Sequence, residues 1–231
     1  MAVKQAQLDG IGAVKLYKRR DSRSIKLTIA PDHVRVTMPM WMPYRAGLEF
    51  LKTKTAWVQK HQKPATFLIS GQLIGKSHRL IFATANNAPN VKTYVSDTQI
   101  TVVHTADTTL LSPGVQRAAR QASVRALRRQ ANNLLPRRAQ QLAEKHGFSY
   151  DTIRVRRLKS RWGSCSQQKN ISLSIYLMQL PWELIDYVLL HELTHTKHLN
   201  HGKDFWDHMD NCLPGAKEMS RQLKPYQPLL W

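Results

Sequence analysis

Residues 191–201 contain the side chains best suited to do chemistry in this 231-residue chain. They read His-Glu-Leu-Thr-His-Thr-Lys-His-Leu-Asn-His. His191 and His195 are four residues apart, so on a helix they project from one face, one turn above the other. Two imidazoles with the carboxylate of Glu192 between them are what a hydrolytic zinc site takes from one helical turn.

A third ligand is expected after the helix has ended. His201 follows His195 by six residues, and the adjacent Gly202 can supply the backbone freedom to redirect the chain. Three histidines leave a fourth position for water, which is typical of a catalytic zinc site rather than a structural one. Asp204 and Asp207 are the competing ligands, because two histidines and a carboxylate also form a known set.

Two more histidines lie near this pattern. One helix cannot easily direct residues 191, 195 and 198 at a single ion, so His198 is expected beside the ligands or in solvent. Asp204 is expected in a similar supporting position if it is not a ligand. His208 is expected on the next helix, in a structural role.

The expected chemistry is hydrolysis by a metal-bound water. Zinc lowers the pKa of its water toward neutrality, and Glu192 would take the proton as general base and later deliver it to a leaving group. Candidates for stabilising the oxyanion are Tyr187, Arg161 and a loop hydroxyl such as that of Ser164. The alternative for Tyr187 is a structural role as a buried aromatic residue of the core, because buried tyrosines are common. Trp162 belongs to the same loop, which is expected to line the cleft.

The segment before the motif has the features of a helix start. Pro181 suits the first turn, and the acidic residues Glu183 and Asp186 suit the positive end of the helix dipole. Strands are predicted over residues 153–158 and 171–177, and helices over 203–212 and 216–224. Strand 171–177 is a candidate edge for pairing with an extended peptide, and an interior strand without a free edge is the equal alternative.

The first half of the chain alternates apolar and polar residues in short runs. A hairpin is predicted over residues 24–29 and 33–38 with a turn at 30–32, followed by a helix over 44–62. The other predicted elements are a hairpin over 67–69 and 73–75, strands over 79–82, 91–95 and 100–103, a turn at 85–90, and a helix over 112–146 that is interrupted or kinked near Pro136. We therefore expect a β-rich module with one helix over residues 1–110 and a catalytic domain over 111–231.

Several motifs resemble those of one family, the YgjP-like zinc metallopeptidases, which are related to SprT-like and other zincin proteases. The resemblance covers most of the chain. It is carried by residues 161–166 (Arg-Trp-Gly-Ser-Cys-Ser), 171–174 (Ile-Ser-Leu-Ser), 181–188, 191–195, 200–202 (Asn-His-Gly) and 205–206 (Phe-Trp). Metzincins share the spacing of the three histidines but place glycine where this chain has His198, so the chain departs from that related group.

The resemblance implies an α+β fold, with a zincin-like metallopeptidase core of helices packed on a small sheet after a β-rich N-terminal module. It implies His191, His195 and His201 as zinc ligands, Glu192 as the catalytic residue, and a peptide or unfolded protein as substrate. Some members of the family are described as nucleoside-triphosphate pyrophosphatases, so hydrolysis of a nucleotide phosphoanhydride by the same metal is the alternative activity.

The charge of the chain is its other unusual property. Lys and Arg number 35 against 15 acidic residues, a net charge of +20, which suggests a polyanionic partner or an acidic substrate. Thirteen of these cations and two acids lie between Val115 and Arg161. A nucleotide or nucleic acid could bind this segment, and a solvated basic face is the alternative. A third hypothesis is a non-enzymatic nucleic-acid-binding protein with structural zinc.

Composition limits the cellular setting. The hydrophobic fraction of 42% is ordinary for a folded protein, and no run approaches the length of a membrane span. The two cysteines, Cys165 and Cys212, do not form a disulfide framework, and the first residues lack the apolar core of a signal peptide. A cytoplasmic protein with no membrane partner is expected.

Overall fold

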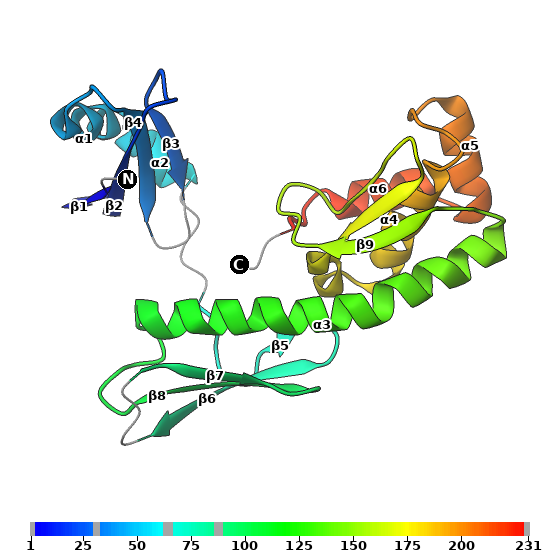
Figure 1. Cartoon of the computed structure of the whole chain (residues 1–231), viewed down its shortest axis with the longest axis horizontal. Helices are drawn as coiled ribbons and strands as arrows, with labels where there is room; N and C mark the ends of the chain where they lie inside the picture. Colours follow the sequence, from blue (N-terminus) through cyan, green and yellow to red (C-terminus); the bar gives the residue numbers. More distant parts are fainter. Residues whose placement is uncertain (1–2, 30–32, 62–66, 86–89, 229–231) are drawn as a thin grey trace. The chain divides into compact units, whose positions relative to one another are not determined.

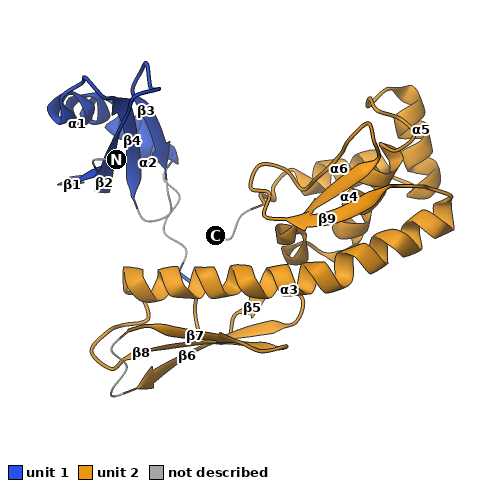
Figure 2. Cartoon of the chain, viewed as in Figure 1, with its two compact units in different colours: residues 1–67, 231 blue, residues 68–230 orange. Residues whose placement is uncertain are grey.

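The computed structural model describes residues 3–29, 33–61, 67–85 and 90–228. The chain divides into two compact units, one over residues 1–67 and the other over residues 68–230 (Figure 2). The described residues combine small sheets with helices, which confirms the expected α+β class. None of their helices is both long enough and apolar enough to cross a bilayer.

The first unit is a four-stranded sheet with two helices. Its strand order is β1-β2-β4-β3, with β2 and β4 parallel and the outer pairs antiparallel. Alternating apolar residues such as Val14, Leu16, Val34 and Val36 are buried on one face of the sheet, where Leu51 joins them from a helix. The elements are β1 (Val3–Leu8), β2 (Gly12–Arg19), β3 (Lys26–Ile29), β4 (Val34–Pro39), α1 (Tyr44–Thr53) and α2 (Thr55–His61).

The predicted hairpin over residues 24–38 is confirmed, because β3 and β4 pair antiparallel. Its turn at residues 30–32 lies outside the described residues, as do residue 62 of the predicted helix and most of the turn at 85–90. The predicted helix over 44–62 is two helices, because the chain leaves helical geometry at Lys54. Strands β1 and β2 were not predicted.

The second unit begins with another four-stranded sheet, of order β5-β6-β8-β7. The predicted hairpin is shifted, because β5 pairs with β6 while residues 67–69 form no strand. The buried side chains of Gln116 and Gln130 hydrogen-bond to the main chain at Leu68, Ile74 and Lys76 and so attach this region to α3. The elements are β5 (Leu73–Ile74), β6 (His78–Ala85), β7 (Lys92–Val95) and β8 (Gln99–Thr105).

Helix α3 (Pro113–His146) connects this sheet to the C-terminal region. Its alanine and leucine content favours a helix, and Gly147 ends it with a positive φ of 65°. Its N-terminal half contacts β7 and β8, and the helix then reaches the strands and helices that follow (Figure 1). Pro136 lies inside the helix and leaves it unbroken, and Figure 1 shows the helix bending in its second half.

The C-terminal region places helices against a three-stranded sheet of order β10-β11-β9. Strand β10 was not predicted, and the predicted strand over 171–177 ends at Ser174, where a 3-10 helix begins. The elements are β9 (Thr152–Arg156), β10 (Gly163–Cys165), β11 (Asn170–Ser174), the 3-10 helix η1 (Ile175–Gln179), α4 (Trp182–Thr194), α5 (Lys203–Cys212) and α6 (Ala216–Leu223).

The compact units divide at Phe67 and Leu68, and not at the boundary between residues 110 and 111 that the sequence suggested. The reason is that α3 supplies the apolar surface against which strands β5–β8 pack, which ties them to the second unit. A catalytic domain limited to residues 111–231 stays a prediction. The N-terminal module of 1–110 also contains two helices instead of one.

Candidate metal centre

Helix α4 carries the first half of the site. It starts after Pro181, has Glu183 in its first turn, and buries Leu184, Val188 and neighbouring apolar residues. Arg138 of α3 donates two hydrogen bonds to the carboxylate of Asp186, at 2.8 and 2.5 Å, and so ties the helix to α3. The helix is therefore held on both its apolar and its polar side before it reaches the histidines.

The chain leaves α4 at His195, the residue that caps the helix. Residues 196–202 form a turn, and α5 begins at Lys203. This turn returns His201 to the end of α4. Gly202 has an ordinary φ of −71°, so the turn does not need the conformational freedom of glycine that the sequence suggested.

Three imidazoles converge at this point. One donor nitrogen from each of His191, His195 and His201 lies within 4.8 Å of the other two. The Nε2 atom of His191 is 3.2 Å from Nε2 of His195 and 3.0 Å from Nε2 of His201. Two nitrogen ligands of a tetrahedral zinc ion are about 3.3 Å apart, so the spacing fits such an ion.

The lowered pKa values of two of these rings also favour binding of a metal cation. Burial, followed by the neighbouring His195 and His201, lowers the pKa of His191 to about 3. Burial lowers the pKa of His195, although its hydrogen bond to the main chain of His198 acts in the opposite direction. Both rings are therefore neutral near pH 7, with lone pairs available to a metal.

His195 and His191 differ in what the second ring nitrogen, Nδ1, contacts. Nδ1 of His195 donates to the carbonyl oxygen of His198 at 3.0 Å, which leaves Nε2 unprotonated for a ligand. Nδ1 of His191 is buried and has no hydrogen-bond partner within the described part of the chain. Phe205 of α5 is fully buried, with its ring centroid 4.7 to 5.0 Å from those of all three histidines. Phe205 therefore packs against the rings of all three histidines.

Glu192 follows His191 directly on α4, and only 6% of its surface is exposed. Burial raises its pKa from the ordinary value of 4.5 to about 8, and the positive charge of Arg161 acts in the opposite direction. The side chain lies directly against β10, because a Cβ atom added at Gly163 would be 2.6 Å from Oε1 of Glu192. Only glycine leaves room for the carboxylate there, a role that sequence reasoning missed.

The loop and strand at 161–165 contribute unequally to this region. Arg161 is exposed and near enough to act on the pKa of Glu192. Cys165 is also near Glu192. Burial is the main cause that raises the pKa of the Cys165 thiol, and the charge of Glu192 raises it further. Side chains alternate along a strand, so Gly163 and Cys165 share the face toward Glu192 while Ser164 faces the other way. Trp162 accepts a hydrogen bond from the amide of Ser174 at its carbonyl oxygen, which holds the loop against the sheet.

Tyr187 is buried, and its ring centroid is 5.9 Å from that of His191. Its pKa is raised by burial, and its hydroxyl hydrogen-bonds to Ser220 on α6. This contact favours the core role over stabilisation of an oxyanion.

The remaining polar residues lie around a pocket beside the turn. His198 lines it together with Asp204 and Asp207, so these carboxylates are not among the three groups that meet at the metal centre. The ring of His198 instead contacts His208, with Nε2 and Nδ1 3.1 Å apart. His198 still supports the centre through its main chain, because its carbonyl oxygen holds His195.

Strand β11 lies between β10 and β9, so the predicted edge at 171–177 is an interior strand. The edges of this sheet are β9 and β10, and β10 is the one next to Glu192. Pairing with the two preceding strands decided this point, and no local pattern in residues 171–177 carries that information.

Comparison with known proteins gives one match over most of the chain. A family model described as YgjP-like, metallopeptidase domain, matches residues 23–226. The metallopeptidase zymogen abylysin of Pyrococcus abyssi is 26% identical, with 40% of this chain and 94% of that chain covered and a TM-score of 0.36. For the zymogen jannalysin of Methanocaldococcus jannaschii the values are 22%, 39%, 94% and 0.36. No curated protein gave a match.

Proposed function

Because this chain belongs to the YgjP-like metallopeptidase family, we propose that it is a zinc-dependent peptidase with Glu192 as its general base. Membership makes the chain a hydrolase of the metallopeptidase class, for which a metal ion is implied and a peptide or protein is the substrate. The identity of the metal, the role of each residue and the way the substrate lies are the parts that we propose.

One observation carries the proposal: three imidazoles converge at the end of the helix that also carries a buried carboxylate. The donor nitrogens of His191, His195 and His201 lie within 4.8 Å of one another, and Glu192 follows the first ligand directly in sequence. An all-nitrogen set of three suits Zn²⁺ with an open position. When bound, the ion lowers the pKa of a coordinated water and polarises the carbonyl of the bond to be cut.

Glu192 handles the proton in this scheme. Burial favours its protonated form at neutral pH, since its pKa is about 8 in the metal-free chain even with the opposing charge of Arg161. The charge of a bound cation would favour the carboxylate and bring the group toward the working range of a general base. The close fit against Gly163 keeps the carboxylate in place while it accepts the proton of the attacking water and passes it to the leaving amine.

The substrate is proposed to pair with β10. This strand is an edge of its sheet, and its Gly163 lies against Glu192. An extended peptide that adds to an edge through main-chain hydrogen bonds would therefore pass the carboxylate. Arg161, exposed at the start of the same segment, is placed to bind a carboxylate of the substrate or a developing oxyanion.

A comparison of wild type with Glu192→Gln tests the proposal. The variant should keep one zinc ion per chain and lose at least about 100-fold in kcat on an unfolded protein or short peptides, because glutamine cannot accept the proton. Metal analysis and a peptide-cleavage assay measure the two quantities.

The control is His191→Ala/His195→Ala, which should lose both the metal and the activity. Nucleoside triphosphates are assayed in parallel. Cleavage of triphosphate without cleavage of any peptide would replace the proposed substrate. Full activity of Glu192→Gln would remove the proposed base.

A further inference from the structure

The pocket beside the turn holds a second group of metal-binding side chains. It has a volume of about 490 Å³ and is lined by His146, His198, His208 and Cys212, together with Asp204 and Asp207. These residues come from the end of α3, the turn after α4, and α5. The centre described above uses none of them as a ligand.

Two of the histidines already stand at the spacing of metal ligands. Nε2 of His198 and Nδ1 of His208 are 3.1 Å apart, between the values of 3.0 and 3.2 Å found within the first centre. A hydrogen bond between the two rings would also give this distance. A shared metal ion is the alternative, and it accounts for the further donor side chains around the two histidines.

Helix α5 directs further donors at the same place. Asp204, His208 and Cys212 are spaced four residues apart, so they lie along one face of the helix, and all three line the pocket. This is the same spacing that brings His191 and His195 together on α4. A thiolate and two imidazoles form a donor set that zinc and cobalt bind well.

We propose that His198, His208 and Cys212 bind a second transition-metal ion next to the first centre. Asp204 or His146 is close enough to the pocket to supply a fourth ligand. Within the described ranges, His191, His195 and His201 are the one group with three donors already within 4.8 Å, so binding of the second ion requires the donors that line the pocket to move closer together.

The charges around the pocket partly oppose and partly assist a cation. Lys197 lies near enough to lower the pKa values of His208 and Cys212, although burial is the larger influence on each. For His208 the effect keeps the ring neutral, which is the form that binds a metal. The carboxylates of Asp204 and Asp207 line the same pocket and would attract a cation.

The two sites share no ligand but meet at one residue. The carbonyl oxygen of His198 accepts the hydrogen bond that orients His195, while its ring faces His208. The second site does not depend on the peptidase activity, so the failure of one proposal leaves the other standing.

Titration of the metal-free full-length protein with Co²⁺ tests the second site. We expect two ions per chain, with absorption in the near ultraviolet from charge transfer between a thiolate and cobalt. His198→Ala/His208→Ala should bind one ion and lack this absorption, and Cys212→Ser should lack the absorption and bind the second ion more than about 10-fold more weakly. Cys165→Ser is the matched control and should behave as wild type.

A second comparison separates the two centres. His191→Ala/His195→Ala should keep one ion with its thiolate absorption, and His61→Ala, which removes an exposed histidine of α2, should keep both ions. Circular dichroism checks that each variant is folded, and His198→Asn/His208→Gln repeats the test if the alanine pair is not. One ion per wild-type chain at excess Co²⁺, or absorption that disappears in Cys165→Ser, would overturn the proposal.

Discussion

Glu192 and His191 are the two residues of the site whose pKa values are shifted furthest by their surroundings. An acid whose pKa is higher in the folded state than in the unfolded state binds more protons when folded, so it lowers stability as the pH rises between the two pKa values. For Glu192 this window runs from 4.5 to about 8 in the metal-free protein. The buried His191, whose pKa falls to about 3, acts in the opposite direction below its ordinary value of 6.5. Above pH 6.5 the effect of Glu192 is therefore the clearer one.

This sign gives a prediction for metal-free protein. Between pH 6.5 and 8 the free energy of unfolding of wild type should fall by about 1–2 kcal/mol relative to Glu192→Gln, which has no proton to lose. Urea denaturation in the presence of a chelator, at several pH values, measures the difference. Parallel curves for the two proteins would mean that Glu192 is not buried as an acid.

Among the strands and helices, β10 most directly fixes the position of the Glu192 carboxylate. Gly163→Ala places a methyl group at 2.6 Å from Oε1 of Glu192, so the carboxylate must move. We expect kcat/KM to fall by about 10- to 100-fold with the bound metal retained, since a displacement near 1 Å can have such an effect. Gly114→Ala is the matched control, because nothing lies within 4 Å of a Cβ atom there. Equal activity in both variants would contradict the close contact.

A second prediction at this scale concerns the joint between α3 and α4. Asp186→Asn removes the charge that receives two hydrogen bonds from Arg138. The Arg138 side chain is 41% exposed, so solvent screening limits the loss to about 1 kcal/mol of unfolding free energy. Asp97→Asn, which breaks the more exposed pair with Arg129, should change stability by less than about 0.5 kcal/mol. Thermal denaturation compares them, and a larger loss in Asp97→Asn would reverse the assignment.

The elements also show how far sequence reasoning reaches. The spacing of His191 and His195 predicts their common face, because helical geometry is local. The contact between Gly163 and Glu192 has no such local signal, since it depends on how a distant strand packs on α4. The interior position of β11 depends on pairing in the same way. Strand β1 was missed because half of its side chains are polar and most are exposed, so its sequence lacks the regular apolar alternation of a half-buried strand.

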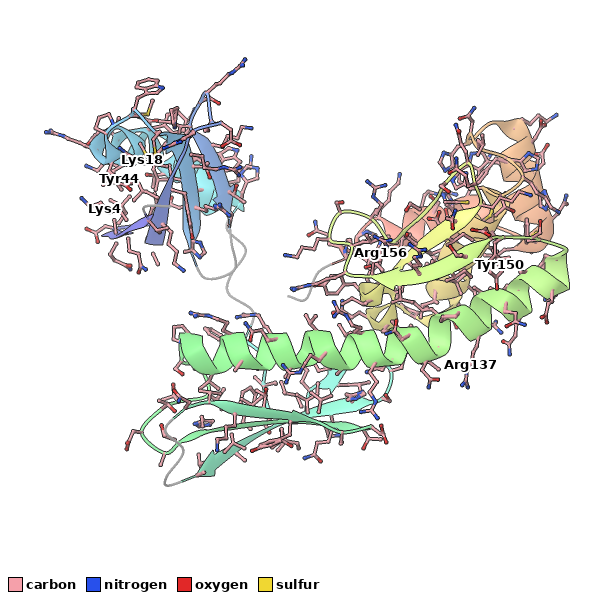
Figure 3. All side chains as sticks on the ribbon, in the orientation of Figure 1. Lys4, Lys18, Tyr44, Arg137, Tyr150 and Arg156 are labelled. Carbon is pink, nitrogen blue, oxygen red and sulfur yellow. The ribbon has the colours of Figure 1, made fainter. Side chains whose placement is uncertain are left out.

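At the scale of the whole molecule, the net charge of +20 remains to be explained. The basic segment between Val115 and Arg161 includes Arg137 on α3 and Arg156 on β9, both exposed (Figure 3). Basic side chains also occur in the first unit, where Lys18 lies over the ring of Tyr44 at 4.7 Å. The positive charge is thus distributed over both units and is not confined to the metal centre.

Such a distribution predicts non-specific binding of polyanions. We expect affinity for single-stranded DNA to fall steeply between about 50 and 200 mM salt, because each phosphate contact releases counterions. Fluorescence anisotropy at several salt concentrations measures the slope. Glutamine at Arg154 and Arg156 should reduce the slope by about 1.4, and a flat response in wild type would identify the charge as a solubility feature.

Helix α3 packs against two sheets. This continuous helix of 34 residues contacts β7 and β8 along its N-terminal half and β9 and α4 further along. We therefore expect a fragment that begins at residue 111 to be less stable than one that begins near residue 68. The shorter piece would expose the apolar stripe formed by residues such as Ala119, Ala122 and Leu127, which β5–β8 normally cover. The smallest fragment that we expect to fold around the histidine centre therefore starts near residue 68 and includes strands β5–β8.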